Sequence, residues 1–375
     1  MYHIIVVGAV YADVILHLES FPDEDSKTRV KAVEHRRGGN GSNSLSVLSQ
    51  LQSLTPSGAD LQLQMAASFA GVRPSYQRPG NTSVSCSDSD TSPAADLLQR
   101  GVSLTHSHFY GDAYRQPTAW ILATSASRTI LNENMLPDYT ASDFRSSVIP
   151  AIRSMLAGGS SSDGESRKLQ FPSQLSRVWV HFEGRCVDEI QGMITSLISL
   201  RKELGFGMEH LCISVEFEKP GRPGLARLLS LADVCFLSKP WVMSEYNPNK
   251  DNDTKNKVAE HILDPCAYLI EISRDVCKPG ARLFATWGEK GAYFSEAGSD
   301  GSVIHISAPD IIPIDTIGAG DTFVAGIIFG IGCMRLTARQ ATTFATCLAS
   351  SKCAQIGFDG LLDSAADSLR SVVID

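Results

Sequence analysis

Strand-length apolar runs alternate with helix-like stretches along this 375-residue chain, and this order restricts its fold more than any other feature. The apolar runs cover residues 3–8, 177–182, 211–217, 233–237 and 281–286. The helix-like stretches cover residues 41–54, 187–204, 223–231, 257–273 and 321–334. Strand followed by helix, repeated, predicts an α/β fold with a mostly parallel central sheet and helices on both faces.

Other segments depart from this order and predict a second, smaller β-sheet. Apolar and polar side chains alternate without helical spacing in residues 10–18, 28–36 and 117–131.

Three polar segments, 72–94, 157–169 and 247–256, are rich in Gly, Ser, Asn and Asp. Such composition is typical of surface loops, so we interpret these segments as insertions without a catalytic role.

Composition excludes several classes of protein. The net charge of −8 disfavours nucleic acid as a partner, because binding to a phosphate backbone needs clustered Lys and Arg. The nine cysteines are scattered and form no C-x-x-C pair, which indicates a reduced, intracellular protein. The start, "MYHIIVVGAV", resembles a first strand and not a signal peptide, and no apolar run reaches the roughly 18 residues that cross a bilayer. We therefore expect a cytoplasmic protein without a membrane partner.

The stretch "IDTIGAGDTFVAGIIFG", residues 314–330, carries the strongest chemical signal. Gly318, Ala319 and Gly320 are small and stand directly before Asp321 and an apolar helix. The first turn of a helix has unpaired N–H groups and partial positive charge, and small residues let an anion approach them. This pattern favours a phosphoryl-binding anion hole with Asp321 as the acceptor of a hydroxyl proton. The alternative is a structural one, in which Asp321 caps a buried helix.

Competing phosphate motifs are absent from the sequence. A P-loop needs a Gly-Lys pair, which this chain lacks, and a dinucleotide fingerprint needs a glycine where Phe323 stands. The nine histidines form no pair with metal-binding spacing. The 314–330 stretch therefore predicts a kinase-type phosphate site more strongly than a nicotinamide or metal site.

A second glycine-rich stretch, "RRGGNGSNSLSVLSQL" at residues 36–51, indicates a polyhydroxylated ligand. Asn40 and Asn43 lie three residues apart at the start of an amphipathic helix, so both amides can face one side. Amides both donate and accept hydrogen bonds, which suits sugar hydroxyls. Asp13, after the first strand, adds a carboxylate that can bind vicinal hydroxyls. Helix capping by the asparagines and a turn position for Asp13 are the structural alternatives.

These motifs resemble those of the ribokinase-like (PfkB) carbohydrate kinases. "DTIGAGDTF" matches their C-terminal signature and "GGNGSN" their N-terminal glycine motif. Within the family the chain is most similar to ketohexokinases (fructokinases), through "SRTILNENMLPDYTASDF", "VWVHFEGR", "ISVEFEKP", "DVCFLSKPWV" and "SSKCAQIGFDG" in the same order. The resemblance spans roughly residues 3–360. It implies one ribokinase-like domain over residues 1–375, with lid strands drawn from about 10–36 and 112–133.

The resemblance also assigns roles residue by residue. Asp321 matches the family's catalytic base, and Gly318, Ala319 and Gly320 match its anion hole. The sugar-binding positions are matched by Asp13, Gly39, Asn40, Asn43 and Asp321. The ATP-binding positions are matched by Arg128, Gly288, Glu289, Lys290, Gly291, Gly318, Gly320 and Gly357. The implied reaction is transfer of the ATP γ-phosphoryl group to the 1-hydroxyl of fructose. The implied cofactors are Mg²⁺ and, as a further candidate, K⁺, and the implied assembly is a homodimer through the lid.

One departure from the wider family concerns magnesium. Many ribokinase-like enzymes carry an Asn-x-x-Glu motif, but the corresponding place here reads "LSKPWVMS". Ketohexokinases share this departure. The protein ligands of Mg²⁺ are therefore not assigned, and Glu183, Glu216 and Glu218 are candidates.

Two alternatives stay open at this stage. The acceptor could be ribose, adenosine or another nucleoside, and Trp120 in the lid could stack on adenine. The chain could also be a non-catalytic sugar-sensing homologue, although such a protein has no need to keep Asp321 together with the anion hole.

Overall fold

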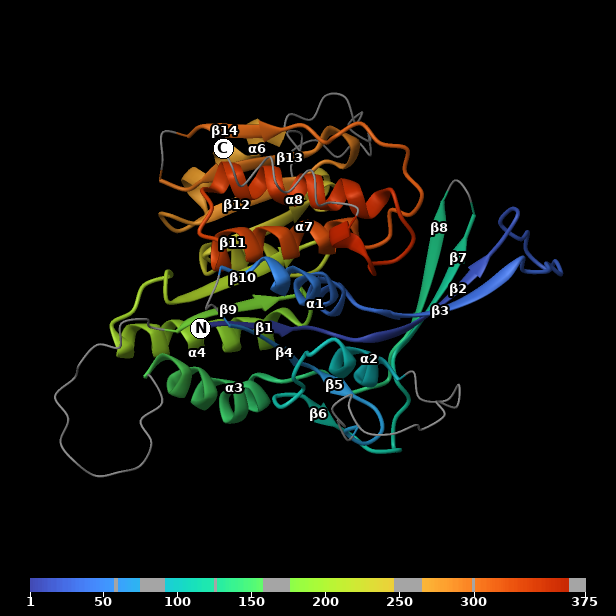
Figure 1. The fold of residues 1–375 in the computed structure, drawn as a ribbon, viewed down its shortest axis with the longest axis horizontal. Helices are drawn as coiled ribbons and strands as arrows, with labels where there is room; N and C mark the ends of the chain where they lie inside the picture. Colours follow the sequence, from blue (N-terminus) through green and yellow to red (C-terminus); the bar gives the residue numbers. More distant parts are fainter. Residues whose placement is uncertain are drawn as a thin grey trace.

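The computed structural model describes residues 1–56, 60–74, 92–124, 127–157, 176–245, 265–298 and 301–363. Its centre is an eight-stranded sheet in the order β14-β13-β12-β11-β10-β9-β1-β4 (Figure 1). The strands are β1 (Tyr2–Val7), β4 (Leu61–Ala66), β9 (Arg177–Phe182), β10 (Leu211–Phe217), β11 (Val234–Ser238), β12 (Arg282–Thr286), β13 (Ala292–Glu296) and β14 (Val303–Ile306). All pairs from β4 to β12 are parallel, and β13 pairs antiparallel with both neighbours. The predicted mostly parallel central sheet is confirmed.

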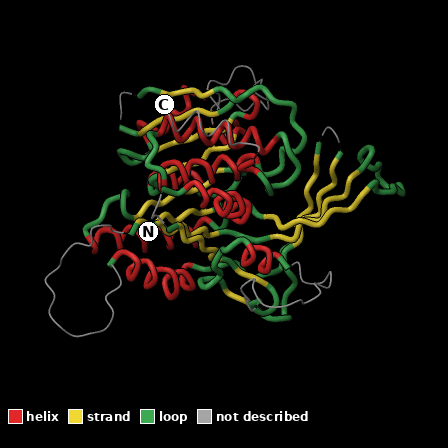
Figure 2. The backbone as a smooth tube through the Cα atoms, viewed as in Figure 1, coloured by secondary structure: helices red, strands yellow, loops and turns green. Residues whose placement is uncertain are grey.

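Helices cover both faces of this sheet (Figure 2). One face packs on α3 (Ala141–Leu156), α4 (Val187–Leu204), α5 (Lys239–Glu245) and α6 (Pro265–Asp275). The other face packs on α1 (Asn40–Leu51), α2 (Pro93–Gln99), α7 (Ala319–Ile327) and α8 (Ala338–Cys353). Each face has its own apolar core, because both sides of each central strand are buried. None of the described helices combines the length and hydropathy needed to cross a membrane.

The second sheet extends away from the main body as a lid (Figure 1). It consists of β2 (Tyr11–His17), β3 (Ala32–Gly38), β7 (Thr118–Ala123) and β8 (Arg128–Glu133), in the order β3-β2-β7-β8. The predicted small sheet is therefore present. The 117–131 segment forms two strands, and β3 starts at Ala32, so Val30 of the expected 28–36 strand lies outside it. A short pair, β5 (Ser68–Phe69) and β6 (His108–Phe109), completes the strands.

Several helix predictions need correction. The 223–231 stretch is a 3₁₀ segment at Leu225–Ser230, because the left-handed Gly224 starts it and its hydrogen bonds stay short in span. The 321–334 helix starts earlier, at Ala319, and changes at Ile328–Cys333 into a π-helix. The 257–273 helix begins at Pro265 within the described residues.

The three expected insertions lie mostly outside the described residues. This applies to all of 247–256, to 158–169 and to 75–91. The end of the 72–94 segment is helical and not loop-like, because Ser92 caps α2 through its side chain and Pro93 occupies the first turn, where a missing N–H costs nothing.

Candidate active site

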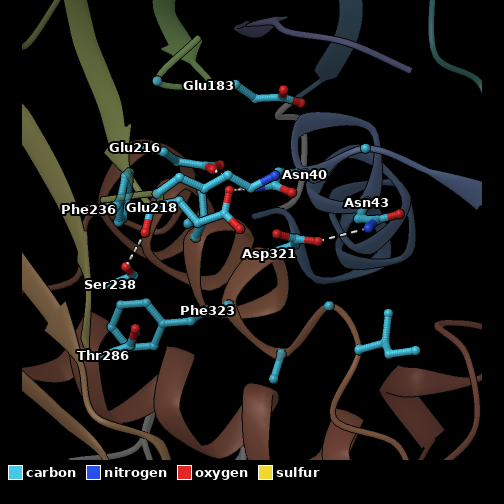
Figure 3. Close-up of a pocket in the computed structure, with 18 of the residues that line it drawn as sticks. Asn40, Asn43, Glu183, Glu216, Glu218, Phe236, Ser238, Thr286, Asp321 and Phe323 are labelled. Carbon is cyan, nitrogen blue, oxygen red and sulfur yellow. Dashed lines mark hydrogen bonds between the residues drawn. The ribbon is translucent and has the colours of Figure 1, made fainter. Parts of the chain in front are cut away.

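A cavity of about 300 Å³ lies between the lid and the carboxyl ends of the central strands. In parallel α/β sheets this edge is where ligands bind, because loops there connect strands to the N-termini of helices. Residues from the lid, from α1, from the ends of β9, β10, β11 and β12 and from α7 all line it. Figure 3 shows the carboxylates and amides that point into it from opposite walls.

The N-terminus of α7 forms one wall. Gly318 precedes the helix with φ +79°, and Ala319, Gly320 and Asp321 make its first turn. A Cβ built on Gly320 would meet no atom within 4 Å, so this turn is open to a ligand. The turn therefore has the free N–H groups and the space of an anion hole.

Asp321 is not the helix cap that the structural alternative required. The position before the helix is Gly318, and no side chain caps this end. The Asp321 carboxylate instead accepts a hydrogen bond from Asn43 Nδ2 at 2.8 Å (Figure 3). Burial raises the pKa of Asp321 well above its ordinary value, and the nearby Glu216 raises it further. A ligand that brings positive charge into this cavity would favour the ionised carboxylate.

Arg37 of β3 orients the Asn43 amide. Its Nη1 donates to Asn43 Oδ1 at 3.2 Å, which leaves Nδ2 to face Asp321. Arg37 itself is held by Asp96, with Nε to Oδ2 at 2.6 Å. Arg37 was not predicted from the sequence, because Arg36 and Arg37 are adjacent and nothing in the pattern distinguishes them.

Asn40 contacts carboxylates and caps nothing. Its Nδ2 donates to Glu216 Oε2 and to Glu218 Oε2, both at 2.9 Å. Gly39 precedes α1 with φ +103°, and a Cβ there would lie 2.2 Å from the carbonyl oxygen of Ala9. Glycine is therefore required at this position, which brings Asn40 to the cavity.

Asp13 reaches the cavity from strand β2 of the lid and not from a turn. Burial raises its pKa to about 6, although Arg37 and Arg36 act in the opposite direction. Its carboxyl group occupies the space that a side chain on Gly38 would need, since a Cβ there would lie 2.0 Å from Asp13 Oδ1. The two adjacent glycines thus serve different purposes: Gly38 admits the carboxylate, and Gly39 permits the turn.

Two further carboxylates are deeply buried in the same cavity. Glu183 accepts the N–H of Gly41 at 2.7 Å and the N–H of Ala9 at 3.2 Å, and burial raises its pKa to about 7. Burial likewise raises the pKa of Glu216 to about 8. The described residues contain no set of three side chains able to hold a metal ion by themselves. A cation here would need additional ligands, such as phosphate oxygens and water.

The predicted nucleotide residues divide into two groups. Arg128 of β8 lines the cavity, and its Nη1 lies 3.5 Å from Thr316 Oγ1 beside the anion hole. Gly288, Glu289, Lys290 and Gly291 form a turn between β12 and β13 that does not line the cavity, and Gly357 does not line it either. Gly357 N donates to Asp315 Oδ2 at 3.2 Å, so it supports the loop that leads to Gly318.

The loop before the anion hole is fixed by ionic contacts that sequence reasoning missed. Lys352 of α8 is fully buried, and its Nζ lies 2.9 Å from both Asp315 Oδ2 and the Asp315 carbonyl oxygen. Arg36 of the lid contacts the same carboxylate at 3.1 Å. Lys352 stands five residues before Gly357, and the sequence gave no sign that it is buried, because the core position is visible only once α8 is packed.

Trp120 does not face the cavity. It alternates along β7 with Ala119 and Ile121, which do line the cavity, so its ring lies on the opposite face of the lid and is 42% exposed. The stacking role considered for an adenosine acceptor therefore has no support at this residue.

Comparison with known proteins shows what this chain is similar to. Residues 273–362 match the pfkB family of carbohydrate kinases. The chain is 28% identical over 363 residues to ketohexokinase of Mus musculus, and the match covers 96% of this chain and 98% of the mouse protein. The resemblance expected from the motifs is confirmed.

Solved structures show the same fold. A ribokinase of Giardia lamblia superposes with a TM-score of 0.67 at 12% identity, covering 98% of this chain and all of the other. A ribokinase of Cryptococcus neoformans, in complex with ADP, superposes with a TM-score of 0.60 at 14% identity and covers 99% of each chain. At these identities the likeness concerns the fold alone.

Proposed function

We propose that this chain, which is similar to the pfkB carbohydrate kinases and to ketohexokinase, is a sugar kinase that transfers the γ-phosphoryl group of ATP to the 1-hydroxyl of fructose. The observation that carries the proposal is the convergence in one cavity of Asp321, the open first turn of α7 and the polar groups of Asp13, Asn40 and Asn43. An anion hole next to hydroxyl-binding groups is the arrangement that phosphoryl transfer to a sugar requires.

In the proposed reaction the sugar lies between the lid and α1. Asp13 accepts hydrogen bonds from hydroxyl groups, and the two amides of α1 provide donors and acceptors. Asp321 orients the reacting hydroxyl and accepts its proton late, because the transition state is loose and needs little base strength. The N–H groups of Ala319 and Gly320 stabilise the charge on the transferred phosphoryl oxygens. Arg128, from the lid, is placed to neutralise the nucleotide phosphates.

The carboxylates fit a magnesium ion carried by the nucleotide. Burial raises the pKa values of Glu183, Glu216 and Asp321, and repulsion from a neighbouring carboxylate raises each of them further. A divalent cation offsets this repulsion, and Mg²⁺ prefers oxygen ligands together with phosphate and water. Glu216 and Glu218 are the side chains that would approach it. When bound, Mg²⁺ neutralises the β and γ phosphate oxygens.

The proposed K⁺ requirement rests on the resemblance, and the proposed cytoplasmic location rests on the scattered cysteines. A requirement for K⁺ is tested by comparing initial rates in KCl and NaCl at equal ionic strength. A cytoplasmic location is tested by fractionation of cells that produce the protein.

Ribose, adenosine and other nucleosides remain the alternative acceptors, although Trp120, the residue considered for stacking on adenine, does not line the cavity. A non-catalytic sugar sensor is disfavoured, because the open turn at Gly320 has no use in binding sugar alone.

An acceptor screen tests the proposed function. ADP production is measured with fructose, ribose, tagatose, xylulose and adenosine, and the position of the new phosphate is read by NMR. We expect fructose to give the highest kcat/KM and the product to carry phosphate on the 1-hydroxyl. Turnover of ribose or adenosine without turnover of fructose would overturn the ketohexokinase assignment but leave the kinase assignment intact.

A further inference from the structure

A second cavity lies at the opposite edge of the central sheet, where the strands begin. Its volume is also about 300 Å³, and it shares no lining residue with the active-site cavity. One wall is apolar and comes from the sheet, through Ile4, Trp179 and Val234; the facing wall comes from Ile328, Ile331 and Leu336. The facing wall includes the π-helix that continues α7.

Three arginines line this cavity. Arg177 begins β9, Arg282 begins β12, and Arg335 follows the π-helix. On their strands Arg177 and Arg282 share the face of Trp179 and Phe284, which is the face covered by α7. Burial raises the pKa of the Cys333 thiol to about 12, and the positive charge of Arg177 acts in the opposite direction. The Arg177 guanidinium therefore lies near Cys333 in the cavity wall.

The positive charge of this cavity is only partly compensated. Within the described part of the chain, the guanidinium groups of Arg177 and Arg335 make no hydrogen bond or ion pair. Arg282 Nε lies 3.4 Å from Glu296 Oε2, at the long end of such a contact. The one acid in the lining, Glu209, is 59% exposed and contacts His210 at 2.8 Å. Arginines with free donors beside an apolar wall are suited to a small molecule with several anionic groups.

The backbone of the facing wall has two costly features. Arg335 has φ +56°, a conformation that residues with a Cβ rarely adopt. The π-helix at Ile328–Cys333 is also rare and is found frequently at functional sites. Its backbone approaches Trp179 closely, since a Cβ on Gly332 would lie 3.2 Å from the indole ring. The wall that carries these two features thus packs directly against Trp179 of the sheet wall.

A buried chain of hydrogen bonds joins Trp179 to the active site. Trp179 Nε1 donates to Ser214 Oγ at 2.7 Å, and the same hydroxyl forms a hydrogen bond with His181 Nδ1 at 2.8 Å. His181 Nε2 forms a hydrogen bond with Glu216 Oε1 at 2.8 Å. The last three side chains are at most 5% exposed. Glu216 in turn holds Asn40, so the chain connects the second cavity to the sugar-binding wall.

We propose that the arginine-lined cavity is an effector site for a small polyanion, a metabolite with at least two phosphate or carboxylate groups. Its occupancy displaces Trp179 and the π-helix, and the His181–Glu216 contact transmits this change to Asn40. The effect falls on the KM for the sugar and not on the KM for ATP, because Asn40 belongs to the acceptor side. The kinetic part of this inference rests on the proposed function, whereas binding to the cavity does not.

Calorimetry tests the site without reference to turnover. Pyrophosphate and citrate are titrated separately into the full chain, with the active site saturated by a non-hydrolysable ATP analogue and fructose. We expect one equivalent of at least one probe to bind, and at least tenfold weaker binding to the Arg177→Gln/Arg335→Gln double variant. The matched control is Arg274→Gln, an exposed arginine paired with Asp275, which should bind as the wild type does. Failure of both probes to bind, or equal binding by the double variant, overturns the site.

Steady-state kinetics test the connection. At constant free Mg²⁺, the probe that binds should change the KM for fructose at least threefold in the wild type. Trp179→Phe keeps an aromatic ring but lacks the N–H donor, so it should bind the probe and lose the change in KM. If Trp179→Phe does not fold, Ser214→Ala breaks the same chain one residue further along. An unchanged KM in the wild type, or an equal change in both variants, overturns the connection. Absence of fructose turnover with intact probe binding would overturn the proposed function instead.

Discussion

Amide side chains control the charged groups of the active site at the scale of single residues. Asn43 holds Asp321 and Asn40 holds Glu216 and Glu218, and both amides come from the first turns of α1. The spacing of the two asparagines was visible in the sequence, and so was the acid after the small residues. Their pairing with carboxylates was not, because Glu216 and Asp321 lie far from the asparagines in the chain and become their neighbours only in the folded protein.

Removal of the Asp13 carboxylate tests the placement of the sugar. Asp13→Ala should raise the KM for fructose strongly, with a loss of about 2–3 kcal/mol for a charge-assisted contact. The KM for ATP should change little, because the proposed reaction places Asp13 on the acceptor side. Steady-state kinetics on both substrates provide the measurement, with Asp23→Ala on the lid surface as a control. An unchanged KM for fructose would show that the sugar lies elsewhere.

The buried Glu216 makes a prediction about pH. Its folded-state pKa of about 8 exceeds its ordinary value of 4.5, so the folded state holds the proton more tightly than the unfolded state. Its contribution therefore favours folding at low pH and is lost as pH rises from about 4.5 to about 8. In the absence of ligands, Glu216→Gln should gain thermal stability relative to the wild type as pH increases through this window. Melting temperatures of the wild type and the variant at pH 5 and pH 8 measure this gain. A difference between the two proteins that does not change with pH contradicts the raised pKa of Glu216.

At the scale of elements, the sequence predicted the central strands well and some helices poorly. Strands β9 and β10 were predicted to the residue, because buried parallel strands read as continuous apolar runs. Strand β4 was missed because its glutamines interrupt the run, although Gln64 is buried. Helix α3 was missed because it contains Pro150 and several serines; Phe144, Val148 and Ile152 nevertheless place a buried stripe along it.

Substitutions in the first turn of α7 should affect stability and activity differently. Gly320→Ala should leave folding intact or improve it, since alanine favours a helix by about 1 kcal/mol over glycine and the new Cβ meets no protein atom. The same Cβ would fill the place of the phosphoryl group, so kcat/KM should fall at least tenfold. Gly318→Ala is the contrast: φ +79° and a 2.2 Å approach to Phe358 should lower both stability and activity. A fully active Gly320→Ala enzyme would refute the anion hole.

At the scale of the whole molecule, the lid leaves apolar side chains exposed. Val33, Trp120 and Leu131 are 50%, 42% and 55% exposed. Trp120 lies opposite Leu131 in the sheet register, so they form one patch on the face turned away from the active site. On a small four-stranded sheet with two open edges, such an apolar face is expected to be covered by a partner surface.

We therefore predict a homodimer in which two lids cover each other. Light scattering at micromolar concentration should give twice the mass of the chain, and Trp120→Glu/Leu131→Asp should give the monomer. A surface double variant away from the lid, Arg153→Glu/Glu203→Arg, should remain dimeric. A fully active wild-type monomer at this concentration would contradict the predicted assembly.

The central claim is that Asp321 and the first turn of α7 carry out phosphoryl transfer. Rapid mixing of ATP and fructose with the wild type and with Asp321→Asn measures the rate of phosphoryl transfer directly, with calorimetry of each ligand as the binding control. The amide keeps the shape of the side chain but cannot accept the proton. We expect the single-turnover rate to fall at least a hundredfold, while the affinities for ATP and fructose stay within a few-fold of the wild type. A variant that binds both ligands and retains most of the wild-type rate would contradict the account.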